Sequence, residues 1–152
     1  MAKWTAFPYD NSAFVYTPTT LKKHWARLHA GDAEPFPKDA DVVQAWIHFH
    51  AGEFQAAYDA GMAAGGAGIT VANKAQAIYA NYLEKKEKVK LEMFLEIAER
   101  AEAQQAEEPK NANAYYWQAY ALGRYGQGIS VAKALAQGLG SKVKTALETT
   151  IK

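Results

Sequence analysis

The sequence predicts an all-α protein, arranged as a stack of antiparallel helix pairs. Residues 39–65 show the clearest pattern: their apolar side chains recur at the i, i+3, i+4 and i+7 spacing that places side chains on one face of a helix. Gly52 divides this stretch into two short helices and Gly65 ends the second, because glycine readily adopts the left-handed conformation at helix C-termini. With so short a turn, the two helices must run antiparallel and bury their apolar faces against each other.

Residues 1–16 are rich in aromatic side chains but have no helical period. Loose termini usually carry few large apolar groups, so we expect these residues to form an extended arm that lies on the helical body of its own chain. Docking of the arm on a neighbouring subunit is the alternative. The aromatic side chains that would anchor the arm are Trp4, Phe7, Tyr9, Phe14 and Tyr16.

The first helix is predicted to begin at Thr17-Pro18 and to run to about Ala30. Threonine caps a helix by accepting from an unpaired backbone N–H, and proline is favoured at the first helical position. Gly31 ends this helix, and two prolines then break the chain before the 39–65 pair begins.

A short internal echo links the ends of two predicted helices. The segment WARLHAGD at residues 25–32 matches WIHFHAGE at residues 46–53. A shared helix-ending pattern explains the echo: an aromatic anchor, a histidine in the last turn where the helix dipole favours it, and then glycine. The offset is shorter than any helix-pair repeat, so it does not define a repeat period.

Residues 70–107 are predicted to form a second helix pair. Thr70 caps its first helix, and the polar run at 85–88 forms the turn. The long helix that follows, up to Glu107, is apolar over more than half of its circumference. Such a helix is typically packed against neighbours on two sides.

Residues 112–152 are predicted to form the third pair. The glycines within 123–126 indicate a turn between helices, Ser130 caps a short helix through Ala136, and Ser141 caps the last helix. The last helix carries an apolar stripe that either faces the body, is covered by a further repeat, or supports formation of a homodimer: Val143, Ala146, Leu147, Thr150 and Ile151.

The motif Gly52-x-Phe54-x-x-Ala57 resembles the core of a tetratricopeptide repeat, with Ala64 seven residues further on and a small residue, Ala45, in the preceding helix. This resemblance implies a right-handed α–α superhelix of about seven or eight helices. It implies that residues 17–152 form a single helical-repeat domain, with pairs at about 39–65, 70–107 and 112–152.

A tetratricopeptide period of about 34 residues would place a turn near Lys86 after the one at Gly52, and the next turn then falls at Gly126. The last third of the chain, with Tyr116-Trp117 and Leu122-Gly123-Arg124, is also similar to the T component of TRAP transporters and to small uncharacterised bacterial proteins related to regulators of microtubule dynamics. The T components carry a lipoprotein cysteine, whereas this chain contains no cysteine. The similarity therefore does not imply a role in transport.

Composition excludes several classes of function. The 152 residues are 49% hydrophobic and 22% charged, with a net charge of +1, so no global field favours nucleic acid or an acidic membrane surface. The absence of cysteine excludes disulfides and thiolate chemistry. No segment approaches the run of about 18 apolar residues that spans a bilayer. We therefore expect a cytoplasmic location, no membrane span and no nucleic-acid partner.

No motif in the chain indicates catalysis or a cofactor. The sequence His48-x-His50 points its two rings to different faces of a helix, and no HExxH pair is present, so we predict helix-end packing for the histidines and no metal site. The glycines at 123–128 follow a helix and lack the GxGxxG spacing of a dinucleotide site. The chain is therefore predicted not to be an enzyme.

The predicted function is that of a scaffold that binds a peptide or a partner helix in a concave groove. By resemblance to tetratricopeptide proteins, the first helices of successive pairs line that groove. The alternative is a small-molecule- or metal-binding helical protein, with a pocket near the N-terminal histidines between the first helix and the 39–65 pair. The residues assigned to the groove are Trp46, His50, Asn73, Gln76, Tyr116, Tyr120 and Arg124.

Overall fold

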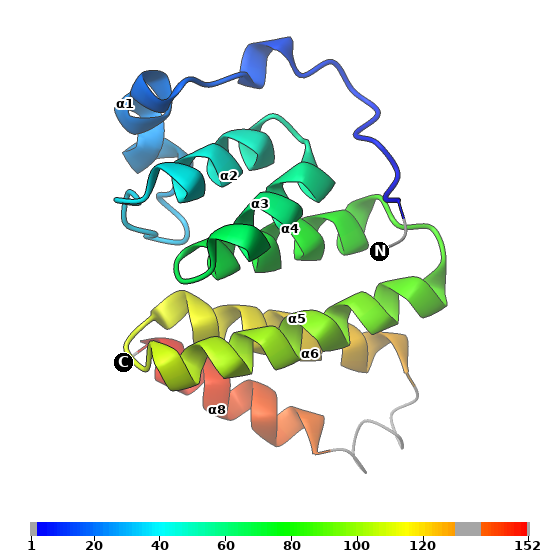
Figure 1. Ribbon diagram of the computed structural model, residues 1–152. Coiled ribbons are helices and arrows are strands. Elements are labelled where there is room, and N and C mark those ends of the chain that lie inside the picture. The colour runs from blue at the N-terminus through cyan, green and yellow to red at the C-terminus, as the bar shows by residue number, and fades with distance from the viewer. Residues whose placement is uncertain (1–2, 130–137, 152) are drawn as a thin grey trace. The chain divides into compact units, whose positions relative to one another are not determined.

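The computed structural model describes residues 3–129 and 138–151, and within these ranges all regular structure is helical. The all-α prediction is therefore confirmed. The elements follow one another along the chain in the order shown in Figure 1. They are a 3₁₀ turn η1 (Ser12–Phe14) and the helices α1 (Pro18–Leu28), α2 (Ala40–His50), α3 (Phe54–Ala64), α4 (Gly68–Tyr82), α5 (Glu87–Glu107), α6 (Ala112–Gly128) and α8 (Leu139–Ile151).

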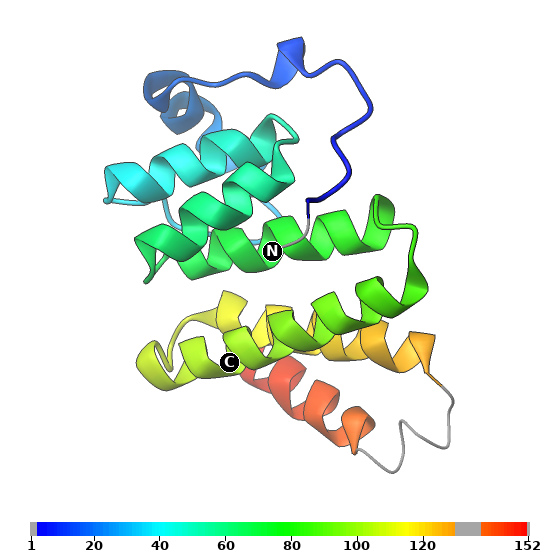
Figure 2. The same cartoon turned by 45° about the vertical axis from the view of Figure 1, so that its right-hand side comes forward.

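The chain forms two compact units, residues 1–75 and residues 76–152, and the division falls within α4. In the first unit, α2 packs against both α1 and α3. In the second unit, α6 packs against both α5 and α8. Figure 2 shows the α2–α3 pair and the α5–α6 pair each lying side by side.

The first helices begin as predicted, but α1 ends at Leu28, two residues before the predicted end at Ala30. Thr17 and Thr20 form a capping box at the start of α1, with proline at the first helical position. Gly52 has a φ of +80° in the turn between α2 and α3, and Gly65 has a φ of +66° at the end of α3. Tryptophan and aliphatic side chains from α1, α2 and α3 form the core of this unit, together with Val71 and Ala75 from the start of α4.

Glycine permits a close approach between α3 and α4. A Cβ atom at Gly61 would meet the carbonyl oxygen of Gly68 and lie 3.0 Å from the backbone nitrogen of Ala72. A Cβ atom at Gly68 would in turn meet the carbonyl oxygen of Gly61. The two backbones therefore touch where both residues lack a side chain.

The predicted start of α4 at Thr70 is wrong by two residues. The N–H of Gly68 donates to the oxygen of Gly65 and the N–H of Ile69 to that of Gly66, so the loop already turns helically before Thr70. Thr70 is buried in the first turn of α4 and is not its cap.

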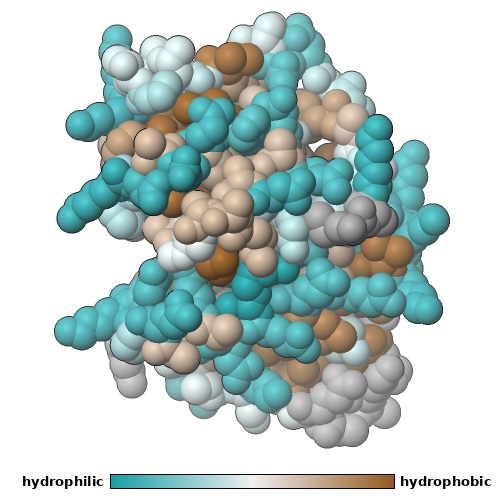
Figure 3. All heavy atoms as spheres, in the orientation of Figure 1, coloured by the Kyte–Doolittle hydropathy of each residue, from teal (hydrophilic) through white to brown (hydrophobic). Residues whose placement is uncertain are grey.

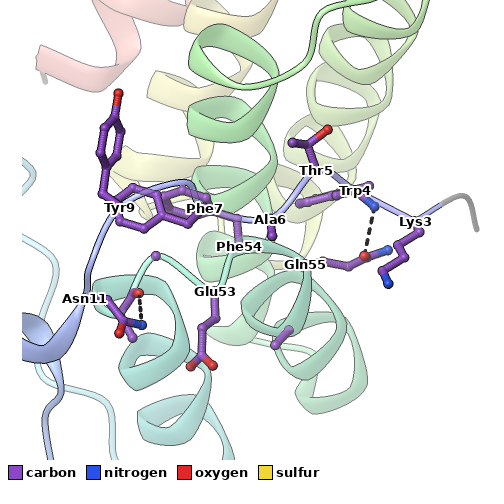
Figure 4. A pocket seen from close by; sticks show the side chains of 13 residues that line it. Lys3, Trp4, Thr5, Ala6, Phe7, Tyr9, Asn11, Glu53, Phe54 and Gln55 are labelled. Atoms are coloured by element: carbon purple, nitrogen blue, oxygen red, sulfur yellow. Dashed lines mark hydrogen bonds between the residues drawn. The ribbon is translucent and has the colours of Figure 1, made fainter.

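The N-terminal arm contacts the α2–α3 pair (Figure 4). The Trp4 N–H donates to Gln55 Oε1 at 3.0 Å, and Asn11 Nδ2 donates to the carbonyl oxygen of Ala51 at 2.8 Å. The Phe7 ring lies over Gly52, where a Cβ atom would approach it to 2.7 Å. A cavity of about 440 Å³ opens between the arm and the start of α3.

In the second unit the turn into α5 comes two residues earlier than the predicted 85–88, and the long helix ends where it was predicted to end. The polar run between Tyr82 and Glu87 forms the turn into α5, and α5 ends at Glu107. Gln76 on α4 is buried and links α4 to α5. Its Nε2 donates to Glu96 at 2.9 Å, and its Oε1 accepts from Arg100 at 3.0 Å.

The predicted turn at 123–126 is wrong, because α6 continues through both glycines to Gly128. Glycine here serves packing and not chain reversal: Gly126 lies against the Leu139 side chain, and a Cβ atom at Gly128 would overlap the Leu91 side chain. The turn expected near Gly126 from the repeat period is therefore absent at that position.

The last helix also begins earlier than predicted. α8 starts at Leu139, directly after Gly138 with its φ of +66°, so Ser141 lies inside the helix and Gly140 does not interrupt it. Of the predicted stripe, Ala146 is buried, whereas Leu147 and Ile151 are exposed. The short helix expected over 130–136 lies outside the described residues.

Candidate functional site

Three of the predicted groove residues come together on one surface of α6. Tyr116, Tyr120 and Arg124 are four residues apart and therefore share one face of the helix. The rings of Tyr116 and Tyr120 have centroids 6.2 Å apart, and the Arg124 guanidinium carbon lies 5.3 Å from the Tyr120 centroid. We call these three residues and the neighbouring Tyr82 the tyrosine face.

Tyr82 is the member of the tyrosine face that sequence reasoning missed. It is the last residue of α4, is 72% exposed, and lies near enough to Tyr120 to influence that residue's titration. Tyr116 is 38% exposed. Large aromatic side chains at the surface are a usual mark of binding sites, so this exposure singles out the face.

Buried aromatic rings support the tyrosine face from within the second unit. Phe94 of α5 lies 6.5 Å from Tyr120, and Trp117 lies 5.3 Å from Tyr120 and 4.9 Å from Tyr116. Phe94 and Trp117 are both buried. The exposed rings are therefore held by packed neighbours and not by flexible loops.

Arg124 gives the tyrosine face a positive charge. Its Nη1 donates to Gln127 Oε1 at 3.3 Å while its guanidinium lies over the Tyr120 ring. Burial raises the pKa of the Tyr120 hydroxyl, and the charge and hydrogen bond of Arg124 offset only part of that increase. The face thus offers neighbouring tilted rings, a neutral phenol and a cation, which suits a partner with an apolar side chain beside a carboxylate.

Three of the four other predicted groove residues are buried and present no surface. Trp46, Asn73 and Gln76 are at most 1% exposed. Trp46 belongs to the core of the first unit, and Gln76 uses both ends of its amide within the second unit. On the face seen in Figure 3, apolar side chains form patches that hydrophilic side chains border.

His50 belongs instead to a polar cluster inside the first unit. His29 Nδ1 lies 3.0 Å from Asp32 Oδ1, and His29 Nε2 lies 3.0 Å from His50 Nε2. Lys74 from α4 donates to Asp32 Oδ2 at 2.7 Å. The His29 ring stacks on Trp25 at 3.7 Å and is buried. We call His29, Asp32, His50 and Lys74 the histidine cluster.

Burial, together with the neighbouring charges, favours the neutral form of His50. Burial, the neighbouring His29 and the Lys74 charge lower the pKa of His50 to about 4, against a smaller opposing effect from Asp32. Burial alone would raise the pKa of Asp32, but hydrogen bonds from His29, Lys74 and the Glu34 N–H, with the Lys74 charge, hold it well below its usual range. Two imidazoles that share an Nε2–Nε2 contact cannot both carry a proton there, because one nitrogen must accept.

The match between residues 25–32 and residues 46–53 is the feature of the sequence that could have indicated this cluster. The two helix-ending histidines that it matches, His29 and His50, contact each other, and the two matched tryptophans lie 5.6 Å apart between ring centroids. The echo therefore marks two helix ends that pack together.

Within residues 3–129 and 138–151, no three histidine, aspartate or glutamate side chains are arranged to hold a metal ion. No helix in the same ranges combines the length and apolar character that crossing a membrane requires. No family model matches the chain, and comparisons with curated proteins and with solved structures likewise find no match.

Proposed function

We propose that this chain is a non-enzymatic scaffold that binds a peptide or a partner helix on the tyrosine face. The observation that supports this function best is the aligned set of Tyr116, Tyr120 and Arg124 at the surface of α6. Tyrosine and arginine dominate the binding energy of protein interfaces when they sit on packed support. The partner chemistry that fits is an apolar anchor beside an acidic group.

The tetratricopeptide resemblance of the 52–57 motif supports the same class of function, since helix-pair repeat proteins commonly act by binding other proteins. A cytoplasmic location belongs to this proposal. The carboxylate-recognising residue is Arg124, and the two tyrosines provide the apolar contact.

Tyr120→Ala and Arg124→Glu are each expected to weaken partner capture about 30-fold, since a central interface residue contributes roughly 2 kcal/mol or more. The measurement is affinity capture from the native cell with quantitative mass spectrometry, comparing each variant with the wild-type chain. Lys110→Glu is the matched control, because it reverses an exposed charge in the turn before α6. Circular dichroism checks that all chains keep their helices. Partners captured equally by both variants and by the wild type would refute the assignment of this face.

A further inference from the structure

A groove in the first unit lies between α1, the segment after it and the start of α2. It has a volume of about 620 Å³. That volume falls in the range of about 300–1,000 Å³ that is typical of small-molecule sites. The position is the one that the sequence allowed for a pocket beside the 39–65 pair, but no histidine lines it.

The floor of the groove is apolar and joined to the core. Pro18, Phe36 and Val43 line it, and Val43 is 8% exposed. The Phe36 ring packs edge-on against the buried Trp25 at 5.2 Å, so its orientation is fixed by the core. An apolar chain or ring placed here would lose water-exposed surface on both sides of the contact, which favours binding.

The rim of the groove is positively charged. Lys22, Lys23 and Lys38 are exposed and line the groove, and no aspartate or glutamate lines it. Lys22 Nζ lies 5.8 Å from the Phe36 ring centroid, so a cation stands directly over the apolar floor. Asp39, the N-cap of α2, and Asp41, in the first turn of that helix, lie nearby but do not line the groove.

We propose that this groove binds a small amphiphilic carboxylate, whose apolar body covers the Phe36 floor and whose carboxylate lies among the three lysines. The apolar body of the ligand gains affinity by burying apolar area on the floor of the groove. The ammonium groups of the lysines at the rim select a ligand that carries a negative charge. This site is separate from the tyrosine face and does not depend on the function proposed for it.

The test uses decanoate as the probe and decanol as its neutral counterpart, each titrated into the full chain and followed by two-dimensional NMR of backbone amides. Decanoate is expected to shift the signals of Lys38 and Val43 saturably, and decanol to bind about tenfold more weakly. The triple variant Lys22→Gln, Lys23→Gln, Lys38→Gln is expected to weaken decanoate binding about tenfold, because each exposed charge contributes roughly a twofold effect.

The matched control removes three exposed lysines at the start of α5, two in the turn before it and one in its first turn, with Lys85→Gln, Lys86→Gln and Lys88→Gln. This control changes the net charge equally and is expected to leave decanoate binding within about twofold of the wild type. Equal weakening in both triple variants, equal binding of decanol, or decanoate shifts confined to other residues would each overturn the proposal. Tighter binding of a short peptide of glutamate and leucine than of decanoate would overturn the small-molecule assignment.

Discussion

Gly61→Ala is expected to lower the free energy of unfolding by about 2 kcal/mol, because the added methyl group overlaps backbone atoms of α4. The atoms in its way are the carbonyl oxygen of Gly68 and the nitrogen of Ala72, and neither can rotate aside as a flexible side chain can. Alanine gains about 1 kcal/mol over glycine in helix propensity, so the loss from overlap must exceed that gain.

Gly123→Ala supplies the control with the opposite sign. Gly123 also lies inside a helix, but a Cβ atom there would meet nothing within 4 Å. This variant is therefore expected to stabilise the chain by about 0.5–1 kcal/mol through helix propensity alone. Urea denaturation of the three chains at pH 7 measures both changes. A Gly61→Ala chain as stable as the wild type would contradict the close α3–α4 approach.

Acid is expected to destabilise the first unit between pH 6.5 and pH 4 through His50. The pKa of His50 is lowered from 6.5 to about 4 by burial, by His29 and by Lys74. Above pH 6.5 the residue is neutral in both the folded and unfolded chains, so no penalty exists there. As the pH falls below 6.5, the unfolded chain takes up a proton that the folded chain refuses, and the loss of stability is complete near pH 4.

The expected loss is about 2 kcal/mol, reduced from the full linkage value because His50 is only partly buried. His50→Gln should abolish the change in stability over this pH range, whereas His48→Gln, at a partly exposed position on the same helix, should retain it. The measurement is the urea unfolding free energy at half-unit pH steps. An equal pH dependence in the His50→Gln chain would contradict the role assigned to His50.

Helix existence could be predicted from the sequence because it depends on local patterns. The capping threonine at 17 and the turn at Gly52 act within a few residues, so spacing and residue type suffice to place them. The errors fell where tertiary packing decided the outcome. Gly126 looked like a turn but is a packing position against Leu139, which lies in a different helix.

The candidate sites were predictable only in part, for the same reason. Tyr116, Tyr120 and Arg124 share a face by helical spacing, which the sequence shows directly. Tyr82 joins them from another helix, and Lys74 reaches Asp32 across 42 residues of sequence. No periodic pattern encodes contacts of that kind, because they depend on how separate helices pack.

Site-specific photocrosslinking tests most directly whether a partner binds the tyrosine face. A benzophenone amino acid would replace Tyr116 on that face in one chain, and Glu102 in another. Glu102 borders a cavity of about 350 Å³ that α5, α6 and α8 line together, with Gln118 and Lys142, and this cavity is a competing surface of the second unit. We predict a specific crosslinked partner from position 116 and none from position 102, and a partner crosslinked only from position 102 would contradict the claim.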